Sequence, residues 1–171
     1  MSKLPREEMI AQSKKLVDSM AEAALNDAKE EMLKRGSVPS VVIGFDGDGR
    51  ELSLRFGFNT PEERRRWLTT VKFLFAIRGI CVYVMVHESW FKSYSKDDAD
   101  AAIADHEWGK LGKEPDRKEA ITVTAVCPIY VAGVGVEVLR ENGKVVGFKD
   151  MPETTKHDGE FTHLIRRERS E

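Results

Sequence analysis

The sequence predicts an α+β domain in which a single antiparallel, or partly mixed, sheet of about five strands carries two long helices packed on one of its faces. Three observations favour this class. Apolar residues recur at helical spacing in two separate segments of the chain. Five further segments have the length and apolar pattern of strands, and most turns between them are too short for anything but antiparallel neighbours. The predicted order is helix, strand, strand, helix, and then three or four strands.

The first predicted helix spans residues 5–35. Pro5 suits a first helical turn, and apolar residues follow it at three- and four-residue spacing, which places them on one face. Gly36 supplies a C-terminal cap, and Pro39 prevents any continuation of the helix. The apolar positions of this face are Ile10, Leu16, Val17, Met20, Ala24, Ala28 and Met32.

A hairpin follows this helix. The run from Val41 to Phe45 is continuously apolar, as expected for a buried strand, whereas apolar and polar residues alternate from Leu52 to Phe58. Between them, residues 46–49 read Asp-Gly-Asp-Gly and predict a turn. This segment superficially resembles a calcium loop, but it lacks the third ligand position and the distal glutamate of an EF-hand.

The second predicted helix begins at a capping box, Thr60-Pro61-Glu62-Glu63, and ends at Gly79. The segment that follows, Ile80 to Glu88, is apolar on both faces. Strands of this kind are buried on both sides, so we expect this one at the centre of the sheet.

Residues 91–118 form a long polar loop. Ser95 could cap a short helix within it. Connections of this length in compact domains are usually functional lids or partly disordered excursions. The loop is therefore a place to look for function.

The C-terminal part of the domain continues the sheet. Ala120–Cys127 and Val131–Arg140 have strand patterns, and Asn142-Gly143 between apolar pairs is a strong hairpin signal. We divide the chain into one domain, residues 1–150, and a polar, loosely ordered C-terminal tail, residues 151–171.

The amino-acid composition limits the kinds of partner that we expect this protein to bind. The 171 residues include 27 basic and 29 acidic side chains, a net charge of −2, which argues against a nucleic-acid or membrane-surface protein. Cys81 and Cys127 lie in apolar runs and are expected to be buried free thiols. The N-terminus lacks the apolar core of a signal peptide, and the sequence predicts a cytoplasmic protein without a cofactor.

One candidate site follows from the predicted sheet. If Ile80–Glu88 and Ala120–Cys127 are consecutive antiparallel strands, the end of the first lies beside the start of the second. This arrangement gathers a polar cluster beneath the long loop, made of His87, Glu88, Trp90, Asp116, Arg117 and Glu119.

The cluster admits three interpretations. Glu88 and Glu119, with His87, could hold a divalent cation through oxygen ligands and one imidazole. His87 could instead act as a general base oriented by a carboxylate. The third interpretation is structural: an ion pair between Arg117 and Glu88, with Trp90 covering the end of the sheet. No spacing typical of a metal site is present, which favours the structural interpretation.

Two short motifs in this region carry a resemblance. His87-Glu88-Ser89-Trp90 follows a strand, and Pro115-Asp116-Arg117-Lys118-Glu119 precedes the next one. The chain thereby resembles a group of uncharacterised bacterial proteins with Ser-Glu-Ala-Trp and Pro-Asp-Arg-x-Glu segments at these places. His87 and Ser89 depart from that pattern, which counts against a ligand role for His87. The resemblance implies no activity.

A second candidate site is the basic run Arg64-Arg65-Arg66 with Trp67. Such a run could contact phosphates, while more often it is the solvated face of an amphipathic helix. The rest of the sequence shows no basic footprint that would extend it.

The leading functional hypothesis is a non-enzymatic binding or accessory domain that acts as a homo-oligomer. The sequence contains no Walker loop, GxGxxG, CxxC pair, HExxH or GxSxG. The edge hairpin at Asn142-Gly143 and the apolar second face of the sheet favour self-association or another protein partner. The alternatives are a metal-dependent hydrolase or nuclease that uses Glu88 and Glu119, and nucleic-acid binding through Arg64–Trp67.

Overall fold

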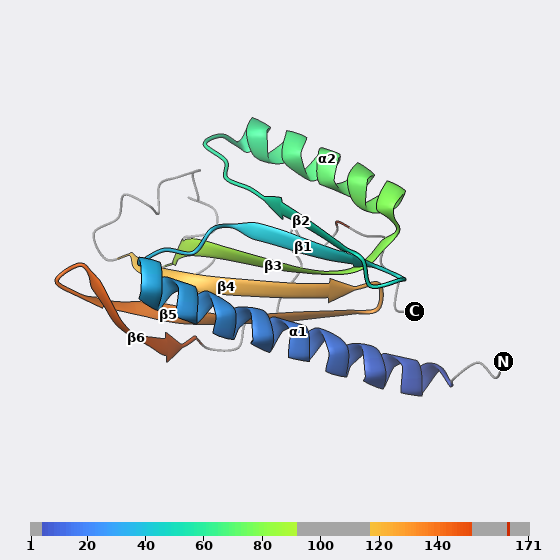
Figure 1. The fold of residues 1–171 in the computed structure, drawn as a ribbon, viewed down its shortest axis with the longest axis horizontal. Coiled ribbons are helices and arrows are strands. Elements are labelled where there is room, and N and C mark those ends of the chain that lie inside the picture. The colour runs from blue at the N-terminus through green and yellow to red at the C-terminus, as the bar shows by residue number, and fades with distance from the viewer. Residues whose placement is uncertain (1–4, 92–116, 152–163, 165–171) are drawn as a thin grey trace, which may run out of the picture.

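The computed structural model describes residues 5–91, 117–151 and 164 (Figure 1). Within these ranges the chain forms two helices and six strands. In chain order they are α1 (Arg6–Arg35), β1 (Val41–Asp46), β2 (Glu51–Arg55), α2 (Pro61–Arg78), β3 (Ile80–Phe91), β4 (Lys118–Cys127), β5 (Tyr130–Glu141) and β6 (Lys144–Asp150). This order confirms the predicted class. The short helix expected within the polar loop lies outside the described residues.

The described strands form one sheet in the order β2-β1-β3-β4-β5-β6. Every neighbouring pair is antiparallel. The strand count exceeds the predicted five by one, because the segment after Asn142-Gly143 is a full strand. Both residues of this turn have positive φ, as a type I′ hairpin turn requires.

Local chemistry explains the ends of both helices. The Thr60 hydroxyl accepts a hydrogen bond from the Glu63 backbone N–H at 3.1 Å, so the predicted N-terminal cap of α2 is confirmed. Gly36 and Gly79 both adopt the left-handed conformation after the last helical residue. Glycine takes this conformation at no steric cost, which fixes where each helix ends.

The two helices cover opposite faces of the sheet (Figure 1). Val84 and Val86 of β3 belong to the core beneath α1, while Tyr83 and Met85 of the same strand belong to the core beneath α2. Our expectation that both helices pack on one face is therefore wrong. The apolar second face of β3 is a protein interior, because successive side chains of a strand alternate between faces and each face has its own helix.

Helix α1 is longer than the sheet that it covers. Its buried residues run from Val17 to Met32, and Figure 1 shows the N-terminal part extending beyond the ends of the strands. Ile10 lies about two turns before Val17 and continues the same stripe, yet it is exposed. The buried stripe of the helix therefore ends where the sheet ends.

The predicted C-terminal tail contributes to the core. Leu164 is buried and belongs to the cluster beneath α2, together with Val71 and Phe75. The remainder of the tail beyond Met151 lies outside the described residues. At least one side chain of the segment that we expected to be loose is thus part of the packed interior.

Neither described helix is long and apolar enough to cross a membrane. Both cysteines are free thiols. Cys127 is buried as predicted, whereas Cys81 is exposed and its Sγ atom lies 3.5 Å from the Phe45 carbonyl oxygen.

Candidate functional site

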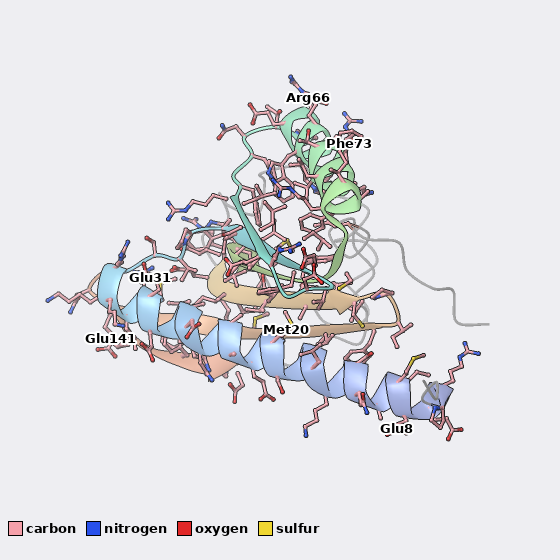
Figure 2. The ribbon with its side chains drawn as sticks, turned by 45° about the vertical axis from the view of Figure 1, so that its right-hand side comes forward. Glu8, Met20, Glu31, Arg66, Phe73 and Glu141 are labelled. Carbon is pink, nitrogen blue, oxygen red and sulfur yellow. The ribbon has the colours of Figure 1, made fainter. Side chains whose placement is uncertain are left out.

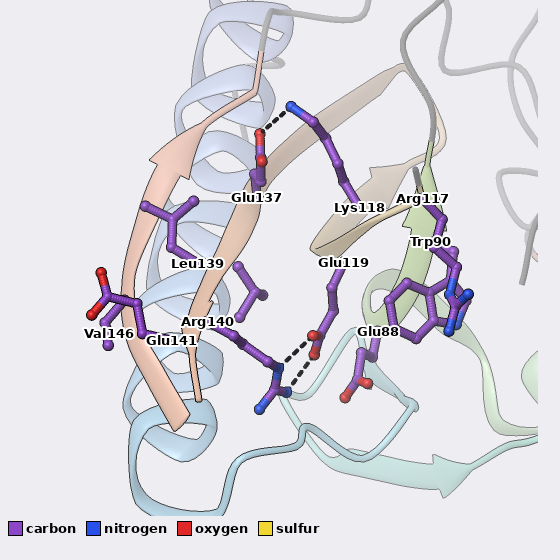
Figure 3. Close-up of a pocket in the computed structure, with 11 residues that line it drawn as sticks. Glu88, Trp90, Arg117, Lys118, Glu119, Glu137, Leu139, Arg140, Glu141 and Val146 are labelled. Atoms are coloured by element: carbon purple, nitrogen blue, oxygen red, sulfur yellow. Dashed lines mark hydrogen bonds and ion pairs between the residues drawn. The ribbon is translucent and has the colours of Figure 1, made fainter. Parts of the chain in front are cut away.

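Four residues of the predicted polar cluster lie where β3 ends, β4 begins and β5 ends: Glu88, Trp90, Arg117 and Glu119 (Figure 3). The strand register places Trp90 opposite Glu119, and Ala120 opposite Glu137, so three strands contribute to one region. An open cavity of about 800 Å³ occupies this region. That volume is within the range of small-molecule binding sites, so the contacts of the charged side chains in the cavity bear on whether it can bind a ligand.

Glu119 forms a buried ion pair with Arg140. Two short hydrogen bonds of 2.6 Å join the Arg140 Nε and Nη2 atoms to the two carboxylate oxygens of Glu119 (Figure 3). Glu119 is 8% exposed, so the paired charge compensates for its removal from water. The hydrogen bond to Glu119 raises the pKa of Arg140, which keeps the guanidinium charged.

Arg140 also connects this pair to α1. Its Nη2 atom donates to the Gly36 carbonyl at 2.7 Å, and its Nη1 atom donates to the Gly143 carbonyl at 3.3 Å. The Gly36 residue is the C-terminal cap of α1. One guanidinium therefore joins the end of the helix, the start of β4 and the β5–β6 turn.

Glu88 also has a structural contact. Its Oε2 atom accepts a hydrogen bond from the Val38 backbone N–H at 3.1 Å, in the segment that links α1 to β1. Glu88 and Glu119 point to the same face of the sheet, since directly paired residues share a face and Trp90 is opposite Glu119. The metal hypothesis required this common face. Each carboxylate, however, already binds a group of the protein itself.

The described residues contain no group of three or more His, Cys, Asp and Glu side chains placed to hold a metal ion. Asp116, which we included in the cluster, lies outside the described ranges. Glu88 and Glu119 thus lie on one sheet face, as the metal hypothesis requires, but the described residues do not supply a set of metal ligands there.

Arg117 and Trp90 also line the cavity. The Arg117 guanidinium carbon lies 4.6 Å from the centre of the Trp90 ring, a cation–π arrangement (Figure 3). The ion pair of Arg117 with Glu88 stays a prediction; the contact that the structure describes for Arg117 is with the indole of Trp90. Beside it, Lys118 pairs with Glu137 at 3.1 Å.

His87 faces the other side of the sheet. Its Nε2 atom lies 2.9 Å from the Thr122 hydroxyl, and the Phe56 ring centre is 6.4 Å from its own. Burial lowers the pKa of His87 below its ordinary value of 6.5, which opposes protonation. The His87 side chain therefore leaves the sheet on the face opposite to that of Glu119 and its partner Arg140.

A smaller cavity of about 240 Å³ is lined by His87 and Glu88 together with Phe56, Phe58 and Arg64, among other residues. Trp67 packs against both phenylalanines, with ring centres 4.9 and 5.5 Å away. Arg65 pairs with Glu62 at 2.7 Å. Within the predicted Arg64–Trp67 motif, Trp67 therefore belongs to an aromatic cluster with Phe56 and Phe58. A nucleic-acid base could stack on Trp67 only if this cluster opened.

Sequence reasoning missed two features. Arg140, the partner of Glu119, lies 21 positions away, and only the strand register brings the two together. Phe73 and Ile77 are 66% and 64% exposed on α2, although they lie in an apolar segment. Their signal was available: four residues apart, they fall outside the stripe of Leu68, Val71 and Phe75 that α2 buries.

Comparison of the chain with models of protein families, with curated proteins and with solved structures finds no match in any of the three. A functional inference therefore depends on the contacts, exposure and charge of the described residues.

Proposed function

We propose that this protein is a non-enzymatic binding or accessory domain that acts as a homo-oligomer. The observation that carries the proposal is the exposed apolar pair Phe73 and Ile77 on the outer side of α2. Figure 2 shows Phe73 and Arg66 projecting from this helix away from the sheet. Large apolar side chains that are two-thirds exposed and adjacent on one helix face favour association, because covering them removes apolar surface from water.

Two threonines extend this apolar surface. The Thr69 hydroxyl donates to the Arg65 carbonyl, and the Thr70 hydroxyl donates to the Arg66 carbonyl, both at 3.0 Å. With each hydroxyl satisfied by its own helix, covering these threonines leaves no side-chain polar group without a partner. We define the α2 outer face as Arg66, Thr69, Thr70, Phe73 and Ile77.

Other surfaces of the sheet are less suited to association. Both of its faces already carry a helix, so our original argument from an uncovered second face does not apply. The edge strand β2 has five residues. The other edge strand, β6, has a register irregularity and carries Lys144 and Lys149. Short, bulged or lysine-bearing edges disfavour strand addition, which leaves helix surface as the better interface.

The enzymatic alternative has less support. Glu119 is held by Arg140, and Glu88 is held by the Val38 N–H. Using either carboxylate as a metal ligand would break a contact that connects α1 to the sheet. A non-enzymatic role accounts for both residues without such a cost.

Sedimentation velocity over a wide range of protein concentration tests the proposal. We expect the wild type to form an oligomer as the concentration rises. Phe73→Ser combined with Ile77→Ser should shift the protein to monomer, because it removes the exposed apolar pair. Leu33→Ser is the matched control, since Leu33 is 56% exposed on α1, and it should leave the oligomer intact. A wild type that stays monomeric at every concentration would contradict the proposal.

A further inference from the structure

We infer that the gap between the start of β4 and the end of β5 binds an extended peptide with basic side chains, which adds a short strand to β5 at Arg140. This site is separate from the proposed self-association and uses a different part of the molecule. Three features support it: the point where backbone pairing ends, the apolar side chains around the cavity, and the charge of the cavity.

The first feature is a divergence between two parts of the sheet. The β4–β5 ladder ends at the pair Ala120 and Glu137. Beyond this pair, β4 stays paired with β3, and β5 stays paired with β6 as far as Glu141. The cavity of about 800 Å³ lies between the two parts, and the Glu119–Arg140 ion pair spans the space (Figure 3). The end of β5 therefore has an edge without a neighbouring strand on its β4 side.

The backbone of Arg140 faces this gap. The β4–β5 hairpin closes at Cys127 and Tyr130, and the β5–β6 hairpin closes at Glu141 and Lys144. The pair that closes a two-residue hairpin is hydrogen-bonded, and the backbone groups of successive residues point to alternate neighbouring strands. Even-numbered residues of β5 therefore direct their N–H and C=O groups toward β4. Among the described residues, none pairs with the Arg140 backbone on that side.

Unpaired backbone groups at a strand edge are a template for another strand. A peptide residue opposite Arg140 can accept a hydrogen bond from its N–H and donate one to its C=O, as in an antiparallel ladder. Main-chain bonds of this kind supply affinity, and the alternate side chains of the peptide supply specificity. The second and third features define those side chains.

The second feature is exposed apolar surface on both faces of the sheet beside the gap. Trp90 lies on the α1 face and is 43% exposed. Leu139 follows Val138 of the α1 core, so it points to the opposite face, and it is 37% exposed. An added strand presents its side chains to both faces in turn. Apolar parts of the peptide can therefore cover Trp90 on one face and Leu139 on the other.

The third feature is an excess of carboxylates. The two ion pairs of the cavity, described above, neutralise each other's charges. The other charged residues that line it are Glu88, Glu141 and Arg117. The cavity thus carries one more acidic than basic side chain. Basic side chains on the peptide compensate this charge, and the exposed Trp90 ring, which already contacts the Arg117 guanidinium, is a suitable surface for a cation.

Hydrogen exchange of single amides tests the strand geometry. The probe is the peptide acetyl-Val-Lys-Val-Lys-Val-amide, added to the isotope-labelled full chain. With about nine-tenths of the protein bound, we expect exchange of the Arg140 amide to slow roughly tenfold, because only unbound protein exchanges freely. The Glu137 and Glu141 amides point toward β6 and should change little.

The matched control is the same peptide with methylated backbone nitrogens, which cannot donate hydrogen bonds to a strand edge. It should leave the Arg140 amide unprotected. Unchanged exchange at Arg140 in millimolar unmethylated peptide, or equal protection by both peptides, would overturn strand addition at this edge.

Charge variants test the choice of a basic peptide. Glu141→Lys should weaken binding of the lysine peptide by up to roughly fivefold, the contribution of one exposed ion pair. Glu51→Lys is the matched control: it makes the same change at an exposed position of β2, on the far edge of the sheet, and should leave the affinity unchanged. Equal affinities of the two variants, or tighter binding of a peptide with glutamate in place of lysine, would overturn the basic ligand.

Discussion

At the scale of single residues, the Arg140 side chain connects several parts of the fold. It binds the Glu119 carboxylate through two nitrogens and the Gly36 carbonyl through one of them. Removing one member of a buried pair leaves the other charge uncompensated, which is more costly than the pair itself is favourable. Arg140 therefore acts in the stability of the fold, and its loss should affect stability before any binding.

We expect Arg140→Met to lower the free energy of unfolding by about 3 kcal/mol, the lower end for a broken buried pair. The lower end applies because the Arg140 side chain is 29% exposed and Glu119 can gain some water. Urea denaturation of the two proteins measures the difference. Lys118→Ala is the control: it breaks the more exposed Lys118–Glu137 pair and should cost less than about 1 kcal/mol. Equal losses in the two variants would contradict this account.

His87 gives the molecule a pH-dependent stability. Burial lowers its pKa in the folded state, so below about pH 6.5 the unfolded chain binds a proton that the folded chain resists. Protons then favour the unfolded state, and stability falls as the pH decreases from that value toward the folded pKa. Above about pH 6.5 the imidazole is neutral in both states and contributes no slope.

His87→Gln should remove this dependence. Between about pH 7.5 and pH 5.5, the wild type should lose more stability than the variant, by at most about 1.4 kcal/mol per pH unit for one proton. Urea denaturation at both pH values measures the two losses. The other three histidines are present in both proteins, so the comparison isolates His87. Parallel pH profiles would contradict a buried, neutral imidazole.

At the scale of elements, α1 has two parts with different roles in stability. Met32 is fully buried beneath the sheet, whereas Ile10 is 43% exposed in the part that extends beyond it. Both residues belong to the apolar stripe that the sequence predicted. The apolar stripe alone does not show which of its residues the sheet buries, because the length of the sheet is set by other parts of the chain.

Alanine substitutions at these two positions should separate the parts. We expect Met32→Ala to cost about 2–5 kcal/mol, since it leaves a cavity in the core. Ile10→Ala should stay within about 0.5 kcal/mol, as surface substitutions usually do. Thermal and urea denaturation measure both. A large loss for Ile10→Ala would show that the N-terminal part of α1 is packed in solution.

Local signals explain which elements could be predicted. The Thr60 cap and the Gly36 and Gly79 helix ends depend on a few adjacent residues, and each was predicted correctly. The Asn142-Gly143 turn is of the same kind. The pairing of Glu119 with Arg140 depends on the register of β4 and β5. The residues next to them in the sequence do not indicate that register.

At the scale of the whole molecule, the main error of prediction was to expect both helices on one face of the sheet, because each face carries one helix. Val84 and Val86, alternating with Tyr83 and Met85, showed that β3 is apolar on both faces. That pattern requires cover on each face but does not say which helix supplies it. With α2 opposite α1, both faces of the sheet are covered, and the exposed apolar pair Phe73 and Ile77 lies on α2.

The position of Leu164 has a consequence for synthesis on the ribosome. The buried strand residues of the core beneath α1 come from β3, β4 and β5, and partly buried residues of β1 and β6 pack against them; all of these strands are translated before Leu164. The core beneath α2 also needs Leu164. Because a nascent chain emerges from its N-terminus, the α1 side of the sheet can assemble while the α2 side still lacks a core residue. The packing of α2 on the sheet is therefore complete only after Leu164 has been translated, long after α2 itself.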